Sequence, residues 1–139
     1  MKNLFFTFIF LIFSSLLSNA IEEKAVPSSV DFDLIKENQT LKSPFKVKMK
    51  VFGLKVRPAG EDTKDSTSGH HHILINSGPI AKGEVIPADD KHIHYGKGQT
   101  EAEIKLPKGE YTLTLQFANG AHQSYGPELS KSIKIKVIE

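Results

Sequence analysis

Histidine is the residue type in this chain with the clearest capacity for chemistry. All six histidines lie between residues 70 and 122, as His70-His71-His72, His92-Ile93-His94 and His122. Residues two apart in a β-strand face the same side of a sheet about 7 Å apart, a spacing from which two imidazoles can converge on one ion. Imidazole binds Zn²⁺ or Cu²⁺ without any thiolate. The spacing therefore predicts a copper or zinc site drawn from His70, His72, His92, His94 and His122.

The same histidines have a structural alternative. A histidine in a strand is often half-buried and hydrogen-bonded to neighbouring backbone, and it then binds no metal. Asp90 and Glu101 could orient an imidazole from outside the coordination shell. Asp89-Asp90 after Pro87 equally suits a turn. Whether His122 reaches the other histidines depends on the topology and stays open here.

Composition excludes several classes of function. The chain of 139 residues has no Cys, which excludes disulfides, thiolate metal sites and a thiol nucleophile. Its formal charge of +2, from 18 basic and 16 acidic residues, is too small and too evenly spread for a nucleic-acid partner. No Gly-x-Ser-x-Gly occurs to mark a nucleophilic serine. These absences favour a role that is not enzymatic.

The first twenty residues have the pattern of an export signal. Lys2 precedes an apolar run over residues 4–13, and Ser18-Asn19-Ala20 offers small residues where a signal peptidase cuts. The run is short for a membrane span, and Glu22, Glu23 and Lys24 follow soon after. We expect a cleaved signal peptide at 1–20, a mature domain at 21–139 with no membrane span, and a periplasmic or secreted location.

The remaining residues show the two-residue period of strands. Apolar and polar residues alternate over 45–52, 101–106, 111–117 and 132–137, with weaker strand patterns at 30–34 and 71–76. Turn residues separate these runs, and 57–69 is predicted to be a mobile loop. The pattern predicts an all-β fold, a single antiparallel β-sandwich of immunoglobulin-like type, with a single-sheet barrel as the alternative.

Tyr111 adds support for the sandwich. It stands just inside a strand, after the turn Pro107-Lys108-Gly109. That position suits a tyrosine corner, in which the hydroxyl hydrogen-bonds back to local backbone.

Two resemblances extend this interpretation. His92-Ile93-His94-Tyr95-Gly96 is similar to the His-x-His-aromatic-Gly segment of copper-zinc superoxide dismutase, although the cysteines of that enzyme are absent. The segments 69–76, 86–101 and 106–109, with His122 downstream, resemble the bacterial family catalogued as domain of unknown function 4399, over about residues 45–138. That resemblance implies an exported bacterial domain and carries no established activity.

Three functions follow, in order of preference. The first is an exported, non-enzymatic β-sandwich that binds a divalent transition metal through its histidines. The second is an interaction module of the cell envelope, whose exposed strand edges recruit an unknown protein partner. The third is a copper- or zinc-dependent enzyme with a site like that of superoxide dismutase.

Overall fold

The computed structural model describes residues 27–139, so the predicted signal peptide lies outside the described residues. Within this range the chain forms nine strands and one short 3₁₀ helix. In chain order they are β1 (Ser29–Phe32), β2 (Gln39–Lys42), β3 (Phe45–Phe52), β4 (Lys55–Val56), β5 (Ser68–Ile75), β6 (His92–His94), β7 (Glu101–Ile104), β8 (Gly109–Ala118), η1 (Pro127–Leu129) and β9 (Ser130–Ile138). Residues 27–139 contain no helix long and apolar enough to cross a membrane.

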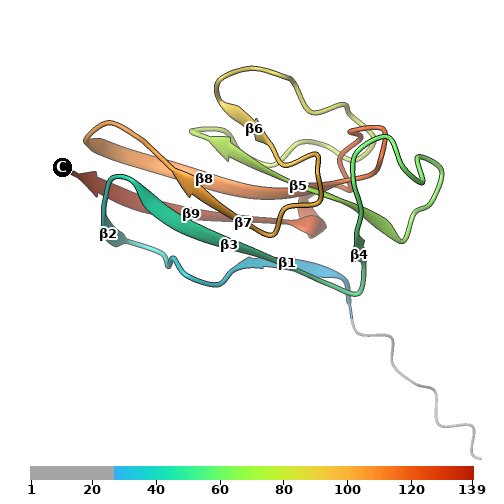
Figure 1. Cartoon of the computed structure of the whole chain (residues 1–139), viewed down its shortest axis with the longest axis horizontal. Coiled ribbons are helices and arrows are strands. Elements are labelled where there is room, and N and C mark those ends of the chain that lie inside the picture. The colour runs from blue at the N-terminus through green and yellow to red at the C-terminus, as the bar shows by residue number, and fades with distance from the viewer. Residues whose placement is uncertain (1–26) are drawn as a thin grey trace, which may run out of the picture.

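The strands form two sheets, which confirms the predicted sandwich over the single-sheet barrel (Figure 1). The smaller sheet has the order β1-β3-β7, and the larger has the order β2-β9-β8-β5-β4, with β6 also paired to β5. Most pairs are antiparallel, while β2–β9 and β4–β5 are short parallel pairs. Strand β5 therefore has β8 along one edge, and β4 and β6 along the other.

The alternation seen in the sequence packs the core between the sheets. In β3 the apolar residues Val47 and Met49 are buried, while the alternating lysines Lys46, Lys48 and Lys50 are exposed or half-buried. In β8 the residues Leu113, Leu115 and Phe117 are fully buried and face the same core. Burial of these apolar side chains is the main stabilising term for a domain without disulfides.

Strand β5 differs from the others because both of its faces are covered. Every residue from Ser68 to Leu74 is buried. Ile73 belongs to the main core, whereas Leu74 packs on the opposite face with Ile86 and Ala118 in a second apolar cluster. Ile86, and Ile80 packed against it, belong to the 77–91 segment, which therefore covers this face of β5 before it leads into β6 (Figure 1).

Hydrogen bonds fasten the 77–91 segment to the larger sheet. The Ile80 amide donates to Gln116 Oε1 at 3.1 Å, and Ser124 Oγ donates to the Ile80 carbonyl at 2.9 Å. The Ile86 amide donates to the His122 carbonyl at 3.0 Å. The outer face of β5 is thus an enclosed environment, and two of its residues are histidines.

Tyr111 forms the predicted corner, since its hydroxyl donates to the Pro107 carbonyl at 2.9 Å. We expect Tyr111→Phe to lower the free energy of unfolding by about 1 kcal/mol, the usual contribution of one such bond. Urea denaturation should show a lower midpoint with an unchanged slope. An unchanged midpoint would show that the bond contributes nothing to stability.

Candidate metal centre

Four imidazole rings gather on the outer face of the larger sheet. His70 and His72 come from β5, His94 from β6, and His122 from the turn after β8. His70 lies 4.8 to 5.0 Å, centroid to centroid, from each of the other three rings. The His94 ring lies 5.0 Å from His72 and 4.7 Å from His122, whereas His72 and His122 are 6.0 Å apart. His70 and His94 therefore occupy the middle of the group, which we call the histidine cluster.

Strand pairing explains how three of these rings meet. His70 and His72 share a face of β5 because they are two residues apart. His94 stands directly opposite His72 in the antiparallel β5–β6 pair, so its side chain lies on the same face.

A tight turn brings the fourth ring. His122 has the left-handed backbone angle φ = 64°, and its amide donates to the Asn119 carbonyl at 2.9 Å. After the turn the chain runs antiparallel to the end of β8, where Ala118 and Ser124 form an isolated β-bridge. The topology thus settles what the sequence left open, because His122 reaches the other histidines.

The ring nitrogens point at one another. His70 Nε2 lies 3.0 Å from His72 Nε2, and His94 Nε2 lies 3.1 Å from His122 Nε2. Without an ion, each contact is a hydrogen bond in which one neutral ring donates. Around a metal with bonds of about 2.0–2.1 Å, neighbouring ligand nitrogens are separated by about 2.9 to 3.4 Å. Both contacts fall within that span.

A three-histidine group has the geometry to hold one ion. Single ligand atoms of His70, His94 and His122 all lie within 4.8 Å of one another. The widest of these separations exceeds the distance between neighbouring ligand nitrogens around a metal. A ring movement of about 1.5 Å would bring the three nitrogens to that distance. His94 is exposed and His122 half-buried, which gives both rings room for such a shift.

Burial keeps these histidines neutral. Burial, with smaller contributions from His94 and His122, lowers the pKa of His70 to about 4. The pKa of His72 falls to about 2, chiefly through burial and then through the neighbouring His70. Burial followed by the nearby His122 also lowers the pKa of His94. At neutral pH these rings are therefore uncharged imidazoles, the form in which histidine binds a metal.

The buried rings also hold polar atoms without partners. Within residues 27–139, the Nδ1 atoms of His70 and His72 make no hydrogen bond. An unpaired buried polar atom costs about 1–3 kcal/mol. The buried side of the cluster thus contains polar nitrogens without hydrogen-bond partners.

His71 lies on the other face of β5, inside the sandwich. It is fully buried against Phe117, with ring centroids 4.9 Å apart, and neither of its nitrogens has a partner in the described part of the chain. Burial, and secondly the neighbouring His70, lowers the pKa of His71 to about 4. This histidine is a core residue and is separated from the cluster by the sheet.

The structure does not bring three of the predicted residues into the cluster. His92 stands opposite Leu74, and its Nδ1 contacts Asp89 Oδ1 at 2.6 Å. Asp90 is exposed, and Glu101 lies 3.6 Å from the Lys48 ammonium. The carboxylate that contacts an imidazole is thus Asp89 rather than Asp90. Asp89 also accepts a hydrogen bond from the Lys91 amide, which fits the turn predicted as the alternative role of Asp89-Asp90.

Sequence reasoning missed the glycines that make room for the cluster. A Cβ at Gly96 would lie 2.2 Å from the His94 ring, so only glycine lets that ring fold back over its own strand end. A Cβ at Gly69 would lie 2.0 Å from the Ala118 carbonyl oxygen. The signal was present, since Gly69 directly precedes the His70-His71-His72 run and Gly96 follows His94 by two residues.

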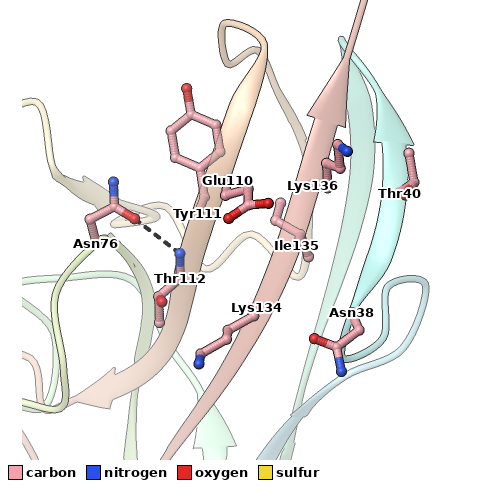
Figure 2. Close-up of a pocket in the computed structure, with 9 residues that line it drawn as sticks. All are labelled: Asn38, Thr40, Asn76, Glu110, Tyr111, Thr112, Lys134, Ile135 and Lys136. Atoms are coloured by element: carbon pink, nitrogen blue, oxygen red, sulfur yellow. Dashed lines mark hydrogen bonds between the residues drawn. The ribbon is translucent and has the colours of Figure 1, made fainter.

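A groove on the larger sheet lies apart from the histidines. It has a volume of about 450 Å³, and it is lined by Asn38, Thr40, Asn76, Glu110, Tyr111, Thr112, Lys134, Ile135 and Lys136 (Figure 2). Figure 2 shows side chains of both charges standing along β8 and β9, with the Thr112 amide donating to Asn76 Oδ1 at 2.9 Å. None of the clustered histidines lines this groove, so it is separate from the candidate centre.

The lowered pKa values predict acid sensitivity. His70, His71 and His72 have ordinary pKa values near 6.5 when unfolded, so the unfolded chain binds more protons between about pH 6.5 and pH 4. Stability should therefore be complete above pH 6.5 and decrease as the pH falls. We expect the melting temperature of the metal-free domain, measured with a chelator present, to drop by several degrees from pH 7 to pH 5.

His71→Leu isolates one contribution to this behaviour, because leucine has a similar volume and no titrating group. The variant should show a smaller drop in melting temperature over the same pH range. An unchanged drop would mean that His71 is not responsible for any of the acid sensitivity.

Comparison with known proteins gives a family and a fold. The model of the family described as Domain of unknown function (DUF4399) matches residues 47–138. The structure is similar to that of the endo-beta-1,4-mannanase from Thermotoga petrophila, with a TM-score of 0.52 and 16% identity, over 84% of this chain and 21% of that chain. At this identity the likeness shows the fold alone, and this chain spans about a fifth of the mannanase. No curated protein matches the sequence.

Proposed function

The chain belongs to the DUF4399 family, a domain of unknown function, and from its geometry we propose that it binds one divalent transition-metal ion. The ligands are His70, His94 and His122, with His72 as the fourth nitrogen donor. The observation that carries the proposal is the convergence of three imidazole nitrogens from separate segments within 4.8 Å of one another.

The ligand set favours Cu²⁺ over Zn²⁺. It consists of imidazoles, which suit both ions, and Cu²⁺ binds more tightly than Zn²⁺ to a given nitrogen site. The absence of Cys from the whole chain argues against a soft Cu⁺ site.

The placement of the rings supports uptake from solvent. His70 and His72 are 0% and 2% exposed, so they form the closed floor of the site. His94 and His122 lie at the exposed rim, where an arriving ion meets them first. The signal-like pattern of residues 1–20 supports the further proposal that this binding takes place in the periplasm or outside the cell.

The test is competitive titration of the mature domain with Cu²⁺ and Zn²⁺ in the presence of a chelator of known affinity. We expect a Cu²⁺ dissociation constant below about 1 µM and weaker binding of Zn²⁺. His94→Ala and His122→Ala should each weaken Cu²⁺ binding by about 100-fold, because each removes one rim ligand. Electron paramagnetic resonance of the Cu²⁺ form should show coupling to several imidazole nitrogens.

His92→Ala is the matched control, since this strand histidine lies outside the group and is held by Asp89. It should leave Cu²⁺ affinity unchanged. Millimolar affinity in the unaltered domain, or equal affinity in His94→Ala and His122→Ala, would exclude the proposed site.

A further inference from the structure

One loop segment is hydrogen-bonded to all three parts of the chain that carry the proposed ligands. The Arg57 amide donates to the Gly69 carbonyl at 2.7 Å, continuing the parallel β4–β5 pairing. The Ala59 amide donates to the Gly96 carbonyl at 2.8 Å, and the Gly60 amide donates to the Gly120 carbonyl at 2.9 Å. Each acceptor lies one or two residues from His70, His94 or His122.

The three acceptors are all glycines, and each lies where a side chain would collide. A Cβ at Gly120 would stand 2.1 Å from the Glu61 carbonyl oxygen. A Cβ at Gly69 would collide with the Ala118 carbonyl, and a Cβ at Gly96 with the His94 ring, so these two glycines make room for other parts of the site. At Gly120 the missing side chain is what allows the loop segment to approach at backbone distance.

The loop segment is itself held in shape. The Glu61 amide donates to the Pro58 carbonyl at 3.3 Å, and Arg57 Nε lies 3.8 Å from Asp62 Oδ2. Farther along the loop, the Tyr125 hydroxyl contacts the carbonyls of Asp65 and Ser68, at 3.2 and 2.6 Å. The loop is thus anchored before and after the residues that reach the ligand segments.

Other contacts join the ligand segments to one neighbour each. Strand β6 pairs with β5 over three residues, and the His122 turn is joined to the 77–91 segment by the bond from the Ile86 amide to the His122 carbonyl and by the bridge between Val85 and Gln123. The loop segment differs because it contacts all three ligand-bearing parts at once. Partners of this kind outside the coordination shell typically change metal affinity by 10–100-fold.

We propose that residues 57–61 form a positioning clamp that sets the spacing of His70, His94 and His122 through their neighbouring glycines. This inference rests on the proposed metal site and adds the element that prearranges it. Because linkage is reciprocal, a bound ion also stabilises the clamp. Metal binding therefore slows the hydrogen exchange of the Arg57, Ala59 and Gly60 amides.

The test uses two variants that leave every histidine in place. Gly120→Ala forces the clamp away from the His122 turn, and Ala59→Pro removes the amide that donates to Gly96. Gly78→Ala is the matched control, because Gly78 has open space around it and no left-handed backbone angle. We expect both clamp variants to bind Cu²⁺ about tenfold more weakly and to give an altered nitrogen coupling pattern in the paramagnetic resonance spectrum. Gly78→Ala should match the unaltered domain in both measurements.

Hydrogen exchange separates positioning from general destabilisation. In the unaltered domain, Cu²⁺ should slow exchange at the three clamp amides, and in Gly120→Ala this metal-dependent protection should be lost while the sandwich strands stay protected. If the unaltered domain binds Cu²⁺ but the folded clamp variants keep its affinity and spectrum, the clamp is overturned and the metal site stands. If the unaltered domain binds no Cu²⁺, the metal site and its clamp are both overturned.

Discussion

Strand β5 places three consecutive imidazoles in positions closed to water, and the surrounding structure is arranged around that constraint. A buried imidazolium without a counter-charge is too costly, so the rings stay neutral. Neutral rings still carry polar nitrogens, and several of these have no partner within residues 27–139. The inner ring, His71, is accommodated by the aromatic side chain of Phe117. The outer rings are accommodated by each other and by two histidines brought in from elsewhere.

Different elements cover the two faces of β5. Strand β8 supplies the inner core and a flat neighbour for β5, while the 77–91 segment and the 119–124 turn close the outer face. In the proposed site, a metal ion would engage the converging Nε2 atoms on that outer face. His71 has no such role, so the histidines on the two faces of β5 lie in different environments.

Residue patterns predicted the sheets well because strands are local objects. The alternation over 45–52 coincides with β3, and the patterns at 111–117 and 132–137 lie within β8 and β9. Tyr111 was identifiable from the turn before it. The histidine spacing also predicted that His70 and His72 share a face.

The rest of the site depends on contacts between distant segments, which spacing alone does not specify. His92 and His94 are equivalent in sequence, yet His94 stands opposite His72 and His92 stands opposite Leu74, beside Asp89. The segment 57–69 has a loop composition, and that composition does not reveal the backbone bonds from residues 57–60 to glycines 12 to 60 residues farther along the chain. Those bonds use main-chain atoms, which leave little trace in side-chain type.

The unequal exposure of the four rings has a kinetic consequence. His70 and His72 are sealed beneath the loops, while His94 and His122 lie at the rim. An ion held by all four could lose a rim ligand to an incoming donor while the floor ligands kept it bound. Exchange would then proceed stepwise through a mixed intermediate, without release of the free ion into solution. The asymmetry of the cluster would therefore give an ion in the proposed site a route for ligand exchange at the rim.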